Sequence, residues 1–248
     1  MLPKPYLLTL KQSKMITPSV LHLGFMRADQ QLFHFIPGQF ITLHFTQEDK
    51  VVRRSYSVAT IPGETDLLEM AVSYVPNGIA SEYLFHLPLE SQVEATGAFG
   101  RLILPAEEPK RYLLVATGTG ITPYRAMLPE LLNRLAKNPA LEVIILQGVR
   151  TRVDLLYAED FLAAARKNPR LQFYVCYSRE FLEQTEIYEK QGYVNQVIKE
   201  LTLDPQNDLV YLCGNPNMID EVFAYLKEQH FSSENIRREK YISPVVKK

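Results

Sequence analysis

Two glycines and a proline in the second half of the chain form the segment best suited to binding a phosphate. The run LLVATGTGITPY places Gly118 and Gly120 between an apolar stretch and an expected helix. Thr122 suits the N-cap of that helix and Pro123 its first position, because the fixed φ of proline is already helical. Glycine lets the backbone approach a ligand closely, and a helix N-terminus offers free N–H groups to an anion. The run predicts a pyrophosphate site without the usual G-x-G-x-x-G fingerprint; the alternative is a glycine-rich turn with no ligand.

The first half of the chain holds a second candidate anion site. In Arg53-Arg54-Ser55-Tyr56-Ser57, the alternation of a strand puts Arg54 and Tyr56 on one face and Arg53 on the other. One strand can therefore offer a cation to a phosphate and a ring to a planar ligand. Downstream, Pro76-Asn77-Gly78-Ile79-Ala80-Ser81 opens a short helix with small residues, which indicates another phosphate site. The alternative for the arginines is an exposed cationic strand.

A cysteine marks the third candidate, VYLCGNPNM, in which Cys213 ends an apolar strand before the turn Gly214-Asn215-Pro216. Ligands of open α/β sheets bind beyond the carboxyl ends of the strands, so this thiol is a candidate ligand contact. The alternative is a buried cysteine that acts as a small apolar side chain. That alternative is our interpretation of Cys176, which lies in the middle of an expected strand.

The elements that must position these residues differ between the two halves. Residues 1–100 hold short β-like runs separated by Pro-Gly and Pro-Asn-Gly turns, with one expected helix at 79–87. The clearest runs are 39–45, 51–60 and 67–75. Closely spaced strands with little room for helices predict an antiparallel barrel or sandwich.

From residue 111 onward, strands and helices alternate. Unbroken apolar runs at 112–116, 143–147, 173–177 and 209–213 are typical of strands covered on both faces. Helical patterns follow at about 123–137, 154–167, 193–201 and 217–229. This alternation predicts a parallel sheet wound by right-handed crossovers. The expected fold class is therefore β + α/β, with domains 1–104 and 111–248 joined by the linker Leu104–Lys110 (LPAEEPK).

Composition excludes several classes of function. The chain has 248 residues, 46% hydrophobic and 22% charged, with a net charge of −1, so we expect no nucleic-acid or membrane-surface partner. It has no apolar run long enough for a transmembrane helix, and its start does not read as a secretory signal. Two cysteines are too few for a disulfide framework or an iron–sulfur cluster. We expect no metal and a reducing, cytoplasmic location.

Together these motifs resemble those of the ferredoxin–NADP reductase family over nearly the whole chain. Arg54–Ser57 resembles the family's R-x-Y-[ST] flavin motif, and Gly78–Ser81 its G-x-x-S pyrophosphate motif. Gly118–Pro123 resembles its G-T-G-x-x-P motif, and Cys213-Gly214 the start of its C-G-x-P-x-M segment. The resemblance implies an N-terminal antiparallel FAD-binding β-barrel followed by a C-terminal parallel-sheet α/β domain that binds NADP.

The resemblance also implies roles for individual residues. Arg54 would bind the FAD pyrophosphate, Tyr56 would lie against the isoalloxazine, and Ser57 would hydrogen-bond near its N5. The implied FAD contacts are Arg54, Ser55, Tyr56, Ser57, Met70, Ala71, Val72, Ser73, Gly78, Ala80, Ser81 and Tyr241. The implied NADP contacts are Thr117, Gly118, Thr119, Gly120, Arg150, Ser178, Arg179, Tyr193 and Cys213. The implied catalytic residues are Ser57, Cys213, Glu239 and Tyr241.

The preference for NADP over NAD depends on Ser178-Arg179-Glu180 and the later Tyr193. An arginine fork suits the 2′-phosphate, whereas an NAD enzyme is expected to carry an acidic residue at the position of Arg179. Plant-type members of the family use a similar Ser-Arg pair with a later tyrosine. Some bacterial members have a second arginine near the position of Tyr193, which this chain lacks. Arg150 and Lys190 are further candidates.

The C-terminus departs from the family pattern. Arg238-Glu239-Lys240-Tyr241 resembles the family ending, in which a glutamate precedes an aromatic residue that covers the flavin. Tyr241 would stack on the flavin, and Glu239 is either catalytic or a surface charge. The added segment Ile242–Lys248 would contact the adenine end of FAD.

The implied function is a ferredoxin or flavodoxin NADP reductase, expected to be a monomer. A carrier would dock near Arg27, Lys50, Arg53 and Arg101. Two alternatives are enzymes, namely the reductase component of an oxygenase and a free-flavin reductase. The alternative from a different class is a non-catalytic flavoprotein, either an electron-transfer subunit or a redox sensor.

Overall fold

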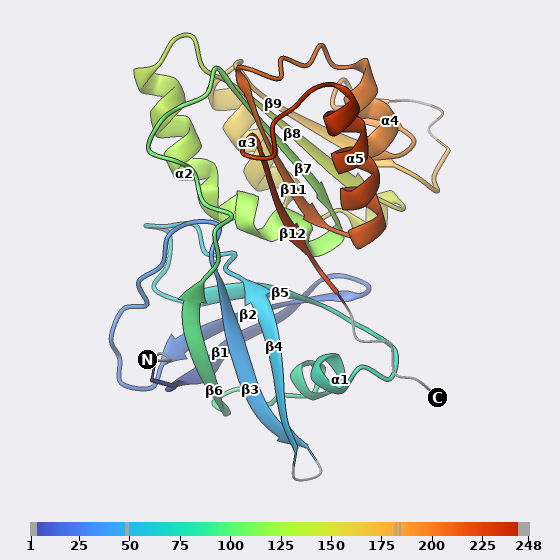
Figure 1. Cartoon of the computed structure of the whole chain (residues 1–248). Coiled ribbons are helices and arrows are strands. Elements are labelled where there is room, and N and C mark those ends of the chain that lie inside the picture. Colours follow the sequence, from blue (N-terminus) through green and yellow to red (C-terminus); the bar gives the residue numbers. More distant parts are fainter. Residues whose placement is uncertain (1–3, 48–49, 182, 184, 243–248) are drawn as a thin grey trace. The chain divides into compact units, whose positions relative to one another are not determined.

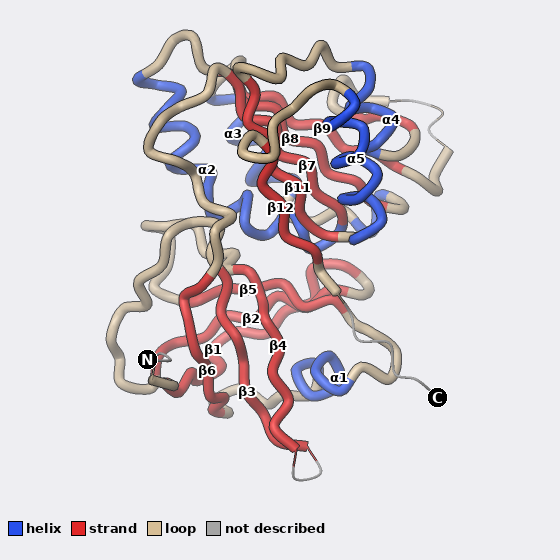
Figure 2. Tube along the Cα trace, viewed as in Figure 1, coloured by secondary structure: helices blue, strands red, loops and turns tan. Residues whose placement is uncertain are grey.

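The structure is a computed structural model that describes residues 4–47, 50–181, 183 and 185–242. The described residues form two compact units. One comprises residues up to Leu104 together with Thr122–Met127, and the other comprises Pro105–Ile121 and Leu128–Ile242. Figure 2 shows that strands dominate the first unit and that strands and helices alternate in the second.

The first unit is built on an antiparallel sheet in the order β4-β3-β6-β1-β2-β5. Its strands are β1 (Tyr6–Thr17), β2 (Val20–Arg27), β3 (Phe40–Gln47), β4 (Lys50–Ser57), β5 (Leu68–Ser73) and β6 (Gln92–Phe99). Just beyond β4, the N–H of Ala59 donates to the carbonyl of Glu69 on β5 at 2.7 Å. This bond joins the two edges of the sheet at one end and bends it into a barrel, as predicted.

Alternate residues of each strand fill the interior of the barrel. Leu8 and Leu10 on β1 are fully buried, as are Ile41 and Leu43 on β3. Because a slip of one residue would turn these side chains toward water, the core fixes the register of the strands. Helix α1 (Ile79–Phe85) is the short helix expected at 79–87, and it ends two residues early.

The second unit contains a parallel sheet in the order β10-β9-β8-β7-β11-β12, which confirms the predicted fold class. Its strands are β7 (Arg111–Thr117), β8 (Glu142–Val149), β9 (Leu171–Tyr177), β10 (Glu189–Gln191), β11 (Asp208–Gly214) and β12 (Ile236–Lys240). The first strand of this unit, β7, lies in the middle of the sheet. Strands β8, β9 and β10 follow one another outward on one side of β7, and β11 and β12 lie on its other side. The order therefore reverses between β7 and β11, and such a switch point is where open α/β sheets form a ligand crevice.

Helices cover both faces of this sheet (Figure 1). They are α2 (Thr122–Lys137), α3 (Ala158–Lys167), α4 (Val194–Val197) and α5 (Pro216–Glu228), with 3-10 turns η1 (Gly118–Ile121), η2 (Arg152–Asp154) and η3 (Ile198–Glu200). Helices α4 and α5 share an apolar cluster with one face of the sheet. On α3, Phe161 stacks on Phe173 of β9 with ring centroids 5.0 Å apart.

Two of the expected helices differ from the observed ones. The helix expected at 154–167 begins only at Ala158, because Tyr157 has a left-handed backbone (φ 56°) that a continuous helix does not allow. The helix expected at 193–201 is divided into α4 and η3.

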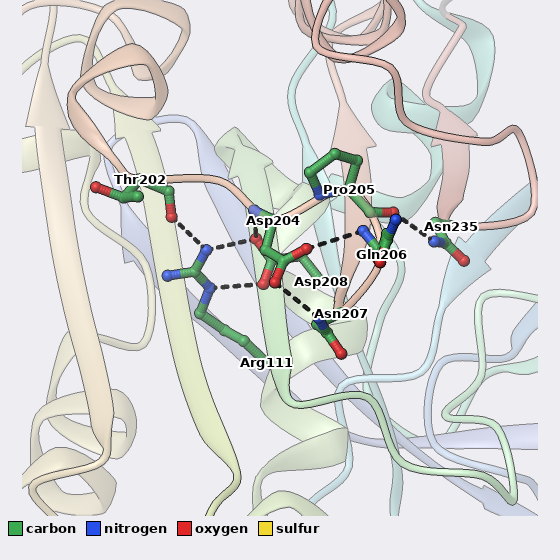
Figure 3. A network of polar contacts seen from close by, with 8 residues as sticks. All are labelled: Arg111, Thr202, Asp204, Pro205, Gln206, Asn207, Asp208 and Asn235. Carbon is green, nitrogen blue, oxygen red and sulfur yellow. Dashed lines mark hydrogen bonds and ion pairs between the residues drawn. The ribbon is translucent and has the colours of Figure 1, made fainter.

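A polar network fastens the amino ends of β7 and β11 (Figure 3). The buried carboxylate of Asp208 receives a bidentate ion pair from Arg111 and the N–H of Asp204, the latter at 2.8 Å. Arg111 also donates to the carbonyl of Thr202 at 2.6 Å. The side chain of Asn235 reaches Pro205 of the same loop, at 2.9 Å, and so connects it to the residue preceding β12.

We expect Asp208→Ala to lower the free energy of unfolding by about 3–5 kcal/mol, because Arg111 would keep its charge at a largely buried site without a partner. Urea-induced unfolding followed by circular dichroism measures this loss. The control is Glu159→Ala, which removes the same charge from an exposed pair with Arg166 at 3.8 Å and should cost less than about 1 kcal/mol. Equal losses in the two variants would contradict the assignment of Asp208 as a buried clamp.

Candidate functional site

Three loops meet at the carboxyl edge of the parallel sheet, beside the switch point. Thr117 ends β7, and its hydroxyl accepts the N–H of Asn215, just after β11, at 2.9 Å. The N–H of Tyr241, just after β12, donates to the carbonyl of Gly214 at 2.8 Å. The three loops therefore form one connected surface, and it contains Cys213 and Glu239 in register across β11 and β12.

The glycines of this surface differ in whether neighbouring backbone leaves room for a side chain. A Cβ on Gly120 would lie 2.3 Å from the carbonyl oxygen of Cys213, so the first loop can pack on β11 only without a side chain there. Gly214 has φ +117°, and a Cβ on it would lie 2.5 Å from the carbonyl oxygen of Thr117. Gly118 also has a positive φ (+52°), but beyond its chain neighbours no atom of the described residues lies within 4 Å of its Cβ position. Gly118 thus faces open space, where a ligand can approach the backbone, whereas Gly120 serves the contact between loops.

The start of α2 differs from the prediction. Thr122 was expected to cap the helix, but the preceding residues already form η1, and Ile121 at the N-cap position has a helical backbone. Thr122 is therefore the first helical residue and Pro123 the second. The buried hydroxyl of Thr122 has no hydrogen-bond partner among the described residues.

Cys213 is a neutral thiol inside this surface. Its side chain is fully buried, and burial raises its pKa well above the ordinary value. The negative charge of Glu239 raises this pKa further, while a hydrogen bond with the Tyr241 side chain acts in the opposite direction. A protonated thiol cannot serve as a nucleophile, which disfavours covalent chemistry at Cys213. Glu239 itself is half-buried.

The residues predicted to select NADP lie at the same edge, on the other side of the switch point. Arg150 follows β8, Ser178 and Arg179 follow β9, and Tyr193 follows β10. The N–H of Arg179 donates to the carbonyl of Arg150 at 2.9 Å, so two exposed arginines are held on adjacent backbones. Lys190 does not join them, because its ammonium lies 5.3 Å from the ring centre of Tyr174.

In the barrel, β4 shows the predicted alternation. Arg54 and Tyr56 are half-buried, whereas Arg53 and Ser55 are exposed. Tyr56 packs against the barrel core, and burial raises the pKa of its phenol well above the ordinary value, so it remains neutral. Ser57, the last residue of the strand, is buried. One face of β4 thus offers a cation and an aromatic ring, which fits a flavin nucleotide.

The second barrel motif is a loop shaped by its own serine. The Ser81 hydroxyl accepts the N–H of Val75 at 3.1 Å and lies 2.9 Å from the Val75 carbonyl oxygen and 3.0 Å from that of Gly78. A Cβ on Gly78 would lie 2.8 Å from this hydroxyl. The Ser81 side chain is thus used inside the loop, which leaves backbone N–H groups at the start of α1 as the candidate phosphate donors. Met70, Ala71 and Val72 are buried on β5, and Ser73 is exposed at its end.

Comparison with known proteins adds independent findings. The family profile described as "Oxidoreductase FAD-binding domain" matches residues 7–103, and "Oxidoreductase NAD-binding domain" matches residues 114–223. Ferredoxin–NADP reductase B of Sorangium cellulosum is 32% identical over 226 residues, which is 88% of this chain and 90% of that protein. The toluate 1,2-dioxygenase electron transfer component of Pseudomonas putida is 27% identical over 95% of this chain and 67% of that protein.

Solved structures agree on the fold. A cytochrome P450 reductase of Amycolatopsis has a TM-score of 0.82 at 27% identity, covering 96% of this chain and 69% of that one. A ferredoxin NADP⁺ reductase of Neisseria gonorrhoeae, solved with FAD and NADP, has a TM-score of 0.81 at 21% identity, covering 96% and 98%. The FAD-binding and NAD-binding domains make this chain an oxidoreductase whose cofactors are FAD and a nicotinamide dinucleotide.

The described residues show neither a membrane-spanning helix nor a cluster of metal-binding side chains. No helix among them is long and apolar enough to cross a membrane. Within the same residues, no group of three or more His, Cys, Asp or Glu side chains is arranged to hold a metal ion.

We expect Gly120→Ala to weaken NADP⁺ binding by about 10–100-fold, because the added methyl group would push the first loop away from Cys213. Isothermal titration measures the dissociation constant, and absorbance of bound flavin checks that the barrel stays loaded. Gly63→Ala is the control for backbone strain alone, since its φ of +90° disfavours a side chain while no atom of another described residue lies within 4 Å of its Cβ position. Unchanged NADP⁺ binding in Gly120→Ala would contradict the role given to this contact.

We expect neither thiol to react with a disulfide reagent at pH 8 in the folded protein. Both cysteines are buried, and burial raises the pKa of Cys176 to about 12. A raised pKa keeps the unreactive protonated form until the pH approaches that value, so labelling should become rapid only in denaturant. Stoichiometric colour development within minutes in native protein would refute the neutral, enclosed state of Cys213.

Proposed function

Because the chain belongs to the ferredoxin–NADP reductase family, we propose that it is a ferredoxin or flavodoxin NADP reductase. The observation that supports this function best is the arrangement of the carboxyl edge of the parallel sheet. There, the open glycine Gly118 and the buried Cys213 lie at the switch point, and the arginine pair lies at the neighbouring strands. One extended dinucleotide fits this edge, with its reactive ring near β11 and its phosphate-bearing adenosine near β9.

Bound FAD supplies the redox chemistry, since a flavin exchanges a hydride with a nicotinamide and single electrons with a carrier protein. The chain's own residues bind and orient. In our proposal Arg54 holds the FAD pyrophosphate with the backbone of Gly78, Ala80 and Ser81. Tyr56 lies against the flavin ring, and Ser57 donates a hydrogen bond to the ring edge.

The remaining flavin contacts come from β4 and β5. We assign them to Ser55 and to the backbone of Met70, Ala71, Val72 and Ser73. The exposed hydroxyl of Ser55 lies 3.0 Å from that of Thr42 on β3, so its orientation is already set. These residues are neutral, which suits a planar ring whose edge exchanges hydrogen bonds with the backbone.

On the nicotinamide side, Thr117, Gly118 and Thr119 contact the ring and its phosphate, with Gly120 supporting them. Cys213 places the ring by contact, and Glu239 supplies a half-buried carboxylate beside it. Tyr241 completes this group by covering the flavin. Its side chain lies within hydrogen-bonding reach of the Cys213 thiol, which places it beside the proposed nicotinamide position. We expected the extension Ile242–Lys248 to contact the adenine end of FAD. Of this segment the structure describes only Ile242.

We propose NADPH rather than NADH as the physiological donor. Arg150 and Arg179 would hold the 2′-phosphate, the hydroxyl of Ser178 would add a hydrogen bond, and Tyr193 would stack on the adenine. Two guanidinium groups on adjacent backbones suit a dianion, because each can form a bidentate contact. The exposed ring of Tyr193 is available for stacking at 56% exposure.

We also propose domain boundaries at 1–104 and 111–248, a monomer, and a cytoplasmic location. The profile matches at 7–103 and 114–223 are compatible with these boundaries. Of the basic residues expected to attract a carrier, Arg27 is already paired with Asp29 at 2.5 Å, so Arg53 and Arg101 are the better candidates. An acidic ferredoxin would be drawn to such a patch mainly through its rate of association.

A second candidate is the reductase component of an oxygenase. Several relatives are such components, and this chain spans 67% and 60% of the length of the first two of them. Its 32% identity with the Sorangium reductase, against 27% and 28% with those two components, favours the first candidate. A free-flavin reductase would not need the phosphate loop of Gly78, and a non-catalytic flavoprotein would not need the assembled nicotinamide site.

We expect purified, flavin-loaded protein to oxidise NADPH with a kcat/KM at least about tenfold above that for NADH, and to reduce a ferredoxin or flavodoxin. Steady-state kinetics with each nucleotide and carrier measure both quantities. Equal or better use of NADH would refute the nucleotide preference. Failure to reduce any carrier, while free flavin or an oxygenase accepts the electrons, would favour an alternative function.

A further inference from the structure

A glutamate next to the arginine pair connects the two loops that carry it. The carboxylate of Glu180, after β9, accepts the backbone N–H of Arg152, after β8, at 2.5 Å. Its other oxygen lies 3.7 Å from the Arg152 guanidinium. The Glu180 side chain is 26% exposed, so solvent competes only partly for this bond. The bond lies immediately beside Arg150 and Arg179.

Arg152 is itself fixed from the opposite direction. Its guanidinium forms a bidentate pair with the buried carboxylate of Glu189 on β10, at 3.1 and 2.9 Å. The pair keeps the pKa of Glu189 below its usual range, so the carboxylate stays charged. The guanidinium also lies 5.8 Å from the ring centre of Tyr177. With these partners, Arg152 is committed to the protein and is not available to a phosphate.

The loop after β8 is held at its far end as well. Asp154 accepts both the N–H and the hydroxyl of Thr151, at 3.1 and 2.9 Å, which closes the turn η2. Ser178 donates its N–H to the carbonyl of Val149 at 3.0 Å. Beyond the end of the strand ladder at Val149 and Tyr177, two further bonds join the loops that carry the arginines. They are the backbone bond from Arg179 to Arg150 and the bond from the Arg152 N–H to the Glu180 side chain.

We infer that Glu180 is a specificity-determining positioning residue, which holds the β8 and β9 loops together so that Arg150 and Arg179 meet the 2′-phosphate of NADP(H) as a pair. This inference rests on the nucleotide preference in the proposed function. A carboxylate beside a phosphate site would otherwise repel the ligand. Here the Arg152 guanidinium, 3.7 Å away and already paired with Glu189, offsets only part of that charge. The length of the Glu180 side chain, which lets it reach the neighbouring backbone, is what the site uses.

The test separates reach from charge with three variants of Glu180. Glu180→Gln keeps the reach and an acceptor oxygen but loses the charge, Glu180→Asp keeps the charge but loses the reach, and Glu180→Ala loses both. The probes are 2′,5′-ADP, which carries the 2′-phosphate, and 5′-AMP, which lacks it. Isothermal titration on the flavin-loaded protein gives both dissociation constants without any turnover.

We expect Glu180→Ala and Glu180→Asp to weaken 2′,5′-ADP by about tenfold, equivalent to about 1.4 kcal/mol, and to leave 5′-AMP unchanged. Glu180→Gln should stay within about threefold of the wild type. The KM for NADPH should follow the same order, with the KM for NADH constant. Glu183→Gln, an exposed charge in the same segment, is the matched control for loss of charge and should bind both probes as the wild type does.

Several results would overturn the inference. If all the Glu180 variants discriminated between the probes as the wild type does, Glu180 would have no positioning role. If Glu180→Gln and Glu180→Ala both bound 2′,5′-ADP more tightly, the carboxylate would act by repulsion. Equal affinity of the wild type for the two probes would overturn the nucleotide preference itself and the inference with it. Thermal unfolding of each variant keeps a folding defect from being read as lost specificity.

Discussion

Parallel pairing of neighbouring strands is the constraint on which the rest of the second unit depends. In a parallel sheet every strand ends at the same edge, so residues far apart in the sequence are brought to one line. Thr117, Arg150, Cys213 and Glu239 share an edge for this reason alone. Hydrogen bonds between the loops then fix which residues along this edge lie next to each other. The bond from the Asn215 N–H to the Thr117 hydroxyl is one example.

The same constraint explains why the glycines cannot be exchanged. Where parallel strands end next to each other, the loops that follow them are crowded together at the carboxyl edge of the sheet. Gly120 and Gly214 resolve that competition by letting two backbones touch, while Gly118 keeps space open. One motif thus combines a packing requirement with a binding requirement, and only the distances between atoms tell them apart.

Much of this fold could be predicted from sequence, but unevenly. The strands at β7, β8, β9 and β11 were found because both of their faces are buried, which leaves unbroken apolar runs. The N-terminal strand β1 gave no such signal, since five consecutive residues from its middle are exposed. Short β10 and the charged β12 were missed for a similar reason. The carboxyl-edge location of Cys213 followed from its place at a strand end, whereas the link from Glu180 to Arg152 joins two loops through a backbone N–H, which no side-chain pattern reveals.

The Arg111–Asp208 network has a consequence for how such a chain can change over time. It fastens the amino ends of β7 and β11, at the edge opposite the loops to which we assign cofactor binding. The contacts that stabilise the sheet and the loops proposed to recognise the ligand therefore lie at opposite edges of one sheet. Loops at the carboxyl edge can be lengthened, replaced or changed in charge while the Arg111–Asp208 network still holds the strands together at the amino edge. A lineage, or a protein engineer, can thus revise what the molecule recognises without rebuilding what keeps it folded.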